Sequence, residues 1–161
     1  MAGVDYRRLG RADLPHVLAM FGRCSRTTLV RRFHGPSDGT SYARQLFTES
    51  DQMTLGAWAD GRCIGIATLA PNGDRYDLGV VIEDDWQRHG VGTALVLRLV
   101  RWARARGIHE LGADVLAESG FVLPALGRIG GVETTLTWGV YCVRIALRDD
   151  AGRRRPEEGL P

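Results

Sequence analysis

Hydrophobic residues along the chain follow two different periods, and these periods predict an order of strands and helices. Residues 53–59, 63–69 and 75–82 are short, mainly apolar runs separated by turn residues, which is typical of strands. Between residues 93 and 106 the apolar positions recur at helical spacing instead. Residues 110–116 return to a strand pattern. The order strand, helix, strand predicts a crossover that joins a parallel pair.

The part of the chain before these strands predicts one further strand, two helices and, over residues 25–36, a short helical or turn-like segment rich in arginine. Residues 5–10 alternate loosely between polar and apolar types and are predicted to form the first strand. Asp13 precedes Leu14 and Pro15, so we expect Asp13 to cap a helix that ends near Arg23. Residues 41–49 are predicted to form another helix.

Glycines mark the turns between these elements. Asp60-Gly61 is a strong signal for a tight hairpin between the first two central strands. Gly73 lies in a second turn, and Gly107 is a suitable residue to end the long helix. Gly139 is predicted to be the turn of a closing hairpin.

The C-terminal part completes a single domain. Residues 119–129 predict a short helix, which its glycines and proline weaken. Residues 132–138 and 140–147 are the predicted strands of the closing hairpin, and residues 149–161 have no apolar period, so we expect a disordered tail. The fold class is therefore α/β (α+β): one domain over residues 1–148 with a mixed sheet of six to seven strands, antiparallel in its first part.

Composition narrows the function classes. A chain of 161 residues with 44% hydrophobic and 25% charged residues is typical of one globular domain. A net charge of +2 gives no electrostatic argument for binding nucleic acid or membrane. The N-terminus lacks the apolar segment of a signal peptide, so we expect a cytoplasmic protein. The three cysteines lack metal-binding or disulfide spacing, and we expect buried thiols and no metal.

One loop carries the clearest chemistry. Residues 87–92, Gln-Arg-His-Gly-Val-Gly, lie between a predicted strand and the long predicted helix. Glycines allow close approach of the backbone to a ligand, and the N–H groups of a helix's first turn bind anions such as pyrophosphate. The loop lacks the third glycine of a dinucleotide-binding fingerprint, and a chain without lysine cannot form a Walker A loop.

The loop instead matches Q/R-x-x-G-x-G/A, the pyrophosphate loop of the GNAT superfamily of N-acetyltransferases. The predicted order of elements resembles the GNAT fold over nearly the whole chain. Within the superfamily the chain is most similar to bacterial Pat-type protein lysine acetyltransferase domains. Two segments carry this narrower resemblance: Ser25-x-x-Thr28-x-x-x-Arg32-Phe33, and Asp77-x-Gly79 followed by Asp84-Asp85-x-Gln87.

The resemblance implies transfer of an acetyl group from acetyl-coenzyme A to a primary amine. It places the coenzyme A contacts on Val80, Val81, Ile82, Gln87, Arg88, His89, Gly90, Val91, Gly92, Thr93 and Ser119. In this family a backbone N–H of the strand before the loop, here near Val81, polarises the thioester carbonyl. The acceptor contacts would be Arg32, Phe33 and His34.

Asp77 is the candidate general base. It lies ten positions before Gln87, where Pat-type enzymes have a catalytic glutamate. Aspartate is one methylene shorter, which leaves room for a bridging water. The tyrosine that acts as an acid in many superfamily members is replaced by Leu126. Pat-type domains lack this tyrosine as well.

Several functional alternatives remain open at this level. The acceptor is expected to be a protein lysine side chain, and a small-molecule amine is the first alternative. The missing tyrosine also fits a regulator that binds acyl-coenzyme A without turnover. The edge of the closing hairpin, residues 132–147, could pair in a homodimer.

Overall fold

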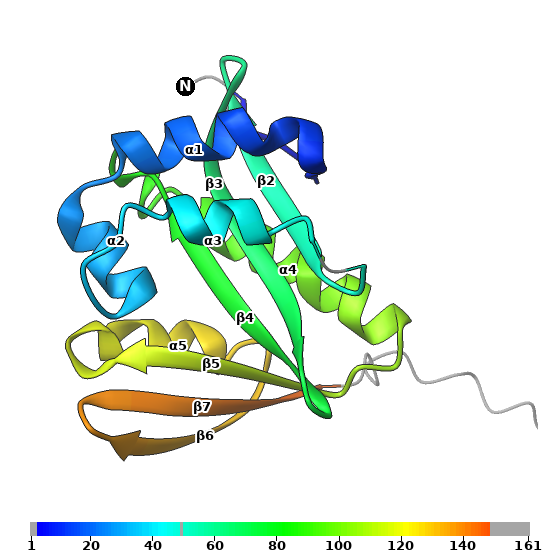
Figure 1. Cartoon of the computed structure of the whole chain (residues 1–161). Coiled ribbons are helices and arrows are strands. Elements are labelled where there is room, and N and C mark those ends of the chain that lie inside the picture. The colour runs from blue at the N-terminus through cyan, green and yellow to red at the C-terminus, as the bar shows by residue number, and fades with distance from the viewer. Residues whose placement is uncertain (1–2, 49, 149–161) are drawn as a thin grey trace, which may run out of the picture.

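A computed structural model describes residues 3–48 and 50–148, and the predicted tail lies outside this range (Figure 1). The centre of the fold is a seven-stranded sheet in the order β1-β2-β3-β4-β5-β7-β6. The strands are β1 (Asp5–Arg8), β2 (Met53–Ala59), β3 (Arg62–Asn72), β4 (Arg75–Ile82), β5 (Glu110–Leu116), β6 (Gly130–Thr137) and β7 (Val140–Leu147). The helices are α1 (Leu14–Arg23), α2 (Arg26–Phe33), α3 (Thr40–Gln45), α4 (Val91–Ala105) and α5 (Leu123–Leu126), with 3-10 turns η1 (Arg11–Asp13), η2 (Asp84–Trp86) and η3 (Ala117–Val122).

The sheet is mixed, as predicted. β4 and β5 are parallel, whereas the other neighbouring strands are antiparallel. The parallel pair is short: only Tyr76 with Leu111 and Asp77 with Gly112 are in register. Beyond these two positions the strands diverge like the arms of a V, because β5 pairs with β7 along its whole length and follows that partner instead (Figure 1).

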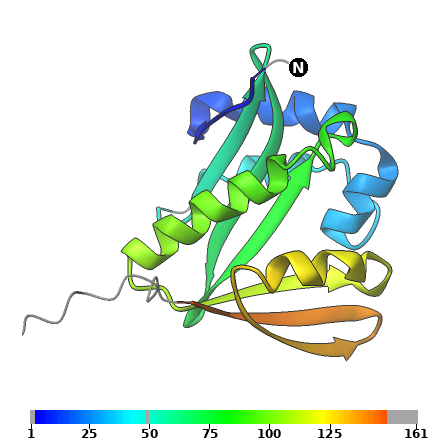
Figure 2. The ribbon, with the colours of Figure 1, turned by 180° about the vertical axis from the view of Figure 1, so that it is seen from behind.

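Helices cover both faces of the sheet. α4 packs on one face, where Leu95 and Leu99 contact a core that includes Leu69 of β3. α1, α2 and α3 cover the other face, where Phe21 packs with Ile66 of the same strand. Figure 1 shows α1 and α3 in front of the sheet, and Figure 2, from the opposite side, shows α4 in front. β3 is therefore apolar on both sides, which explains its almost continuous hydrophobic sequence.

The predicted turns are confirmed. Asp60 and Gly61 both have positive φ, 50° and 75°, as a tight hairpin between twisted strands requires. Trp138 and Gly139 repeat this geometry between β6 and β7, with φ of 51° and 75°. Gly107, with φ of 72°, follows Arg106, the C-cap residue of α4. Glycine takes this left-handed conformation at little cost.

Other predicted boundaries are corrected by tertiary pairing. β3 runs on to Asn72 because β4 continues to pair with it up to Arg75. The helix expected over residues 41–49 is confined to Thr40–Gln45. The helix expected over residues 119–129 is a 3-10 turn followed by the single turn of α5. Of the three thiols expected to be buried, only Cys63 is; Cys24 is half-buried and Cys142 is exposed.

Asp13 precedes α1 as predicted, but its side chain does not cap that helix. The carboxylate instead accepts hydrogen bonds from the Gly10 backbone N–H, at 2.8 Å, and from the Arg7 guanidinium. The hydrogen bonds from Arg7 outweigh the effect of burial and hold the pKa of Asp13 below its usual range. The aspartate therefore closes the turn that leads from β1 into α1.

Two carboxylates join the end of β4 to the helices of the opposite half. Glu83 is buried, and its two oxygens accept from Arg23 Nε at 3.1 Å, while Arg23 also donates to the Cys63 carbonyl. Asp84 accepts from the Ser25 backbone N–H at 2.8 Å and from the Ser25 hydroxyl at 2.6 Å. Burial disfavours the charged form of Asp84, but the bonds from Ser25 outweigh it, so its pKa lies below the usual range. These contacts hold α1 and α2 against β4.

No helix among the described residues is long and apolar enough to span a membrane.

Glu83→Gln is expected to lower the free energy of unfolding by about 2 kcal/mol, because it leaves the Arg23 guanidinium without its counter-charge in a largely buried place. Glu110→Gln is the matched control, since its pair with Arg144 is exposed and contributes little. Chemical denaturation measures both variants. An equal, small change in the two would contradict a structural role for the Arg23–Glu83 pair.

Candidate functional site

The divergence of β4 from β5 leaves backbone donors of β4 unpaired. In an antiparallel ladder, alternate residues direct their N–H groups to the same neighbour. The Glu83 N–H donates to the Ile64 carbonyl of β3 at 2.9 Å. This alternation also directs the Val81 N–H to β3 and the N–H groups of Val80 and Ile82 to the β5 side. Because β5 has left the ladder there, these two donors face the gap.

A cavity of about 500 Å³ occupies this gap on the α4 side of the sheet. Its walls come from the end of β4, from β5, from α2, from the first turns of α4, and from η3 and α5. Apolar side chains such as Val96, Val115 and Leu126 form much of the lining. A narrow, mainly apolar slot between two strands suits a flexible chain that carries amide groups, because the chain can bond to the free strand edge.

The loop at the mouth of this cavity presents a helix N-terminus. Gly90, with φ of 80°, precedes α4, and no side chain caps the helix. The N–H groups of its first turn are therefore available to an anion. Gln87 fixes the loop to α2 and β4, because its side-chain amide donates to the Thr28 hydroxyl at 2.9 Å and to the Ile82 carbonyl at 3.0 Å.

The structure brings most of the predicted coenzyme A contacts together. The residues among them that line the cavity are Val80, Val81, Ile82, Gln87, Gly92, Thr93 and Ser119. The other four do not line it. Arg88, His89 and Gly90 are exposed, and Val91, the first residue of α4, is buried in the core.

Ser119 has a feature that the sequence could not show. The side chain is buried, and its hydroxyl has no hydrogen-bond partner within the described part of the chain. A buried hydroxyl without a partner costs free energy unless a ligand satisfies it. Ser119 lines the cavity, so a polar group of a bound chain could be that partner. Leu126, which replaces the tyrosine of other superfamily members, lines the cavity, and none of the described lining residues is a tyrosine.

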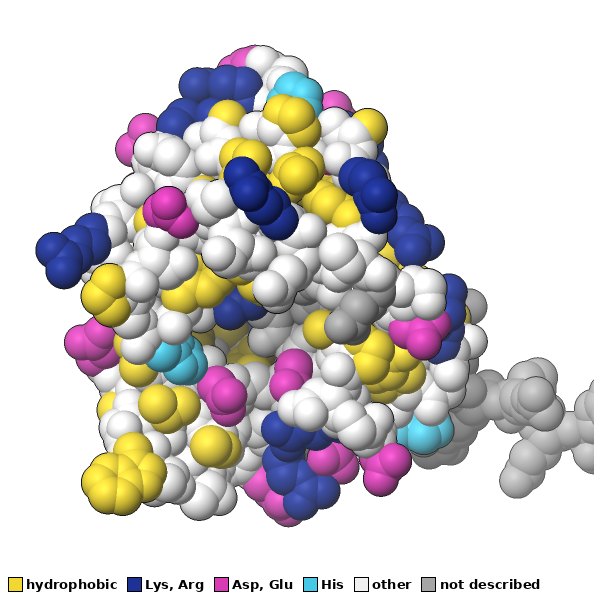
Figure 3. Space-filling model, in the orientation of Figure 1, with side chains coloured by type: hydrophobic (Ala, Val, Ile, Leu, Met, Phe, Trp, Pro, Cys, Tyr) yellow, Lys and Arg dark blue, Asp and Glu magenta, His cyan; other side chains and the backbone are white. Residues whose placement is uncertain are grey.

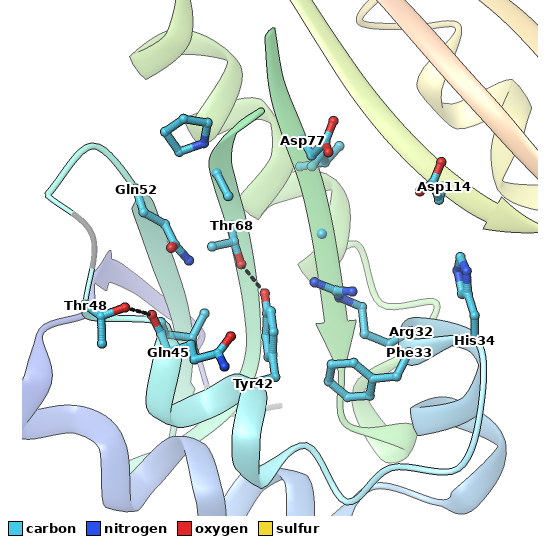
Figure 4. A pocket seen from close by; sticks show the side chains of 15 residues that line it. Arg32, Phe33, His34, Tyr42, Gln45, Thr48, Gln52, Thr68, Asp77 and Asp114 are labelled. Carbon is cyan, nitrogen blue, oxygen red and sulfur yellow. Dashed lines mark hydrogen bonds between the residues drawn. The ribbon is translucent and has the colours of Figure 1, made fainter. Parts of the chain in front are cut away.

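A second cavity, of about 570 Å³, lies on the other face of the sheet (Figure 4). Arg32, Phe33 and His34, the residues predicted as acceptor contacts, line this cavity from the end of α2. Tyr42 of α3 adds a further wall, and its hydroxyl is hydrogen-bonded to that of Thr68 at 2.8 Å. Figure 3 shows the corresponding hollow, with basic atoms in its depth and acidic side chains around it.

Asp77 lines this second cavity and is held by two neighbours. Asn72 donates to one carboxylate oxygen at 2.7 Å, and Arg75 Nε lies 3.3 Å from the other. Gly112 lies opposite on β5, and a side chain there would collide with both Asp77 and Arg75. The carboxylate is therefore oriented by its surroundings, although 40% of the side chain is exposed.

Asp114 is a second carboxylate that sequence reasoning missed. It lines both cavities, and no hydrogen bond or ion pair connects it to another described residue. Strand alternation in the sequence places residues 110, 112, 114 and 116 on one face of a strand. Only the register of Asp77 with Gly112 shows that this face is the one that carries Asp77.

The two cavities meet at the point where the strands diverge. Arg32, Leu78, Gly79 and Asp114 line both of them. A group bound in one cavity can therefore reach a group bound in the other through the gap between β4 and β5. This arrangement suits a transfer reaction between two substrates that enter from opposite faces of the sheet.

Comparison with known proteins agrees with this geometry. The model of the acetyltransferase (GNAT) family matches residues 24–120, which is more than half of the chain. The chain belongs to the GNAT family of acetyltransferases. No curated protein sequence matches it. This GNAT protein is accordingly an acyltransferase (EC 2.3.1.-) of a family that uses acetyl-coenzyme A as the acyl donor.

Solved structures show the same fold at low sequence identity. The GNAT domain of S. lividans PAT matches with a TM-score of 0.80 and 19% identity, covering 89% of this chain and 90% of that one. The ribosomal-protein-S18-alanine N-acetyltransferase of Escherichia coli matches with a TM-score of 0.71 and 16% identity, covering 95% and 99%. The PaiA N-acetyltransferase of Thermoplasma acidophilum, in complex with coenzyme A, has a TM-score of 0.68 and 15% identity, covering 89% and 99%.

The GNAT site residues fit coenzyme A on three grounds. The uncapped start of α4 suits the pyrophosphate, the free edge of β4 suits the amides of the pantetheine chain, and the Ser119 hydroxyl lacks a partner that such a chain could supply. The acidic turn before the loop is already bonded to Ser25 and Arg23 and does not compete for the helix N-terminus.

Ser119→Ala is expected to raise the KM for acetyl-coenzyme A about three- to tenfold, because one hydrogen bond to the bound chain is lost. The kcat and the melting temperature should change little, since the hydroxyl has no partner in the protein itself. Ser41→Ala, at an exposed position of α3, is the control. An unchanged KM in the Ser119 variant would exclude the contact.

Proposed function

We propose that this acetyltransferase transfers the acetyl group to a protein lysine side chain, with Asp77 as the general base. We call the cavity on the α4 side of the sheet the donor cavity, and the second cavity, on the other face, the acceptor cavity. The observation that carries the proposal is that the two cavities meet, with Asp77 in the acceptor cavity and the free edge of β4 in the donor cavity. The acceptor cavity opens between α2, α3 and the sheet, as a surface for a protein chain requires (Figure 3). The similarity in fold to S. lividans PAT supports the same reading.

The donor supplies an acyl thioester when it is bound, and the protein contributes orientation and proton transfer. The N–H groups of Val80 and Ile82 face the gap and are the candidate donors to a carbonyl oxygen there. An incoming ammonium group must lose a proton, because only the neutral amine can attack. The thiolate that leaves needs no strong acid, since the pKa of a free thiol is only about 8.5. This agrees with a donor cavity that has no tyrosine among its described lining residues.

Asp77→Asn is expected to lower kcat roughly 10²- to 10⁴-fold near neutral pH, because a positioned base contributes about that much to the rate. The amide keeps a similar shape and can still bond to Asn72. Asp114→Asn, on the facing strand and in the same cavity, is the matched variant. Steady-state thiol-release kinetics at several pH values measure both. A normal rate in the Asp77 variant, with a large loss in the Asp114 variant, would assign the base to Asp114.

The acceptor class can be tested directly. A cell lysate is incubated with the protein and isotope-labelled acetyl-coenzyme A, and the products are analysed by mass spectrometry. We expect labelled acetyl groups on protein lysine side chains, and no label above background with the Asp77→Asn protein. Label only on small amines would contradict the lysine acceptor. Tight binding of acetyl-coenzyme A without any product would indicate a binding protein instead.

A further inference from the structure

Arg32 lies where the two cavities meet. Its guanidinium rests on the backbone of Gly79 in β4, and an added Cβ at position 79 would collide with the guanidinium nitrogens and come within 2.8 Å of its central carbon. Two aromatic rings hold it from the α2 and α3 side: Tyr42, 4.6 Å from the guanidinium carbon to the ring centre, and Phe33, at 5.2 Å. Figure 4 shows the side chain pointing from α2 into the space in front of β4. The absence of a side chain at Gly79 gives Arg32 its place.

The charge of Arg32 has no counter-charge within the described part of the chain. Four other arginines show the contrast: Arg7 pairs with Asp13, Arg23 with Glu83, Arg75 with Asp77 and Arg144 with Glu110. The Nε atom of Arg32 is buried and makes no hydrogen bond. Burying part of a charged group without an anion to bind costs free energy. Contacts with aromatic faces offset this only in part.

The acids of the cavity do not supply the missing anion. Asp77 is already bonded to Asn72 and lies beside Arg75. Asp114 lines the same two cavities but makes no ion pair with Arg32. The junction therefore presents one unpaired guanidinium and one unpaired carboxylate. The anion that fits Arg32 must arrive with a substrate.

We propose that Arg32 is a carboxylate-binding residue, and that one of the two substrates carries this carboxylate to the junction. The proposal rests on one part of the proposed function, acyl transfer at the junction, and does not depend on the identity of the acceptor. A carboxylate is favoured over a phosphate because the phosphates of coenzyme A have their own site, at the start of α4 beyond the other end of the gap. The planar guanidinium suits bidentate binding of a carboxylate.

Two substrates could bring the same group. A dicarboxylic acyl donor, such as succinyl-coenzyme A, would extend its terminal carboxylate from the donor cavity toward Arg32. An amino acid acceptor would place its carboxylate on Arg32 and its ammonium group near Asp114. The first source is compatible with a lysine acceptor, whereas the second would replace it. Both sources require the charge and the fork-like donors of Arg32.

The donor arm of the test compares succinyl-coenzyme A with butyryl-coenzyme A, which has the same chain length without the carboxylate. Dissociation constants are measured by calorimetry and kcat/KM by thiol release with the same amine. If the donor is the source, the wild-type protein prefers the succinyl donor about ten- to a hundredfold, and Arg32→Gln lowers the ratio of the succinyl to the butyryl values to about one.

The acceptor arm uses acetyl-coenzyme A with a panel of free amino acids, each against its own carboxamide. If the acceptor is the source, at least one acid is preferred over its amide by about tenfold or more, and Arg32→Gln removes the preference through KM. Arg32→Lys keeps the charge without the bidentate geometry, so it should retain part of the preference in whichever arm responds.

Arg26→Gln is the matched control, because it makes the same change of charge on the exposed first turn of α2. It should leave every preference unchanged. The proposal is overturned if neither arm shows a preference for the carboxylate in the wild-type protein, or if the preference persists in Arg32→Gln. Failure of the proposed acyl transfer would be seen separately, as an absence of thiol release, while the calorimetric comparison of donors still reports on Arg32.

Discussion

The short parallel pairing of β4 with β5 is the constraint on which the rest of the site depends. Two residue pairs join the strands, and then β5 follows β7 away from β4. A longer ladder would use the N–H groups of Val80 and Ile82 and would fill the gap with backbone. The early end of pairing therefore creates both the donor edge of β4 and the passage between the two cavities.

The C-terminal end of β4, where β5 no longer pairs with it, is held by polar contacts rather than by further strand pairing. The buried Glu83 binds Arg23 of α1, and Asp84 binds Ser25, the N-cap residue of α2. Gln87 bonds to Thr28 of α2 and to the last carbonyl of β4. These contacts replace the missing strand neighbour and seat α2 beside β4. They also place Arg32, at the far end of α2, over Gly79.

Much of the fold is visible in the sequence because it depends on local rules. The strands over Met53–Ala59 and Glu110–Leu116 were predicted to the residue, since turn residues bound each apolar run. The hairpin turn at Asp60-Gly61 follows from the positive φ that such residues accept. Gln87 and Gly92 identify the loop by spacing alone. Where long-range pairing sets a boundary, as at the end of β3, the sequence pattern predicts a strand that is too short.

The sequence by itself determined the family and the positions of the Gln87–Gly92 loop, Asp77 and Arg32 along the chain. Only the tertiary structure decided what these side chains face. Asp114 and Asp77 share a cavity because of the register between two strands that lie far apart in sequence, and no local pattern encodes that register. The unpaired charge of Arg32 is likewise a property of its surroundings, since an ion pair exists only when folding brings an acid within reach.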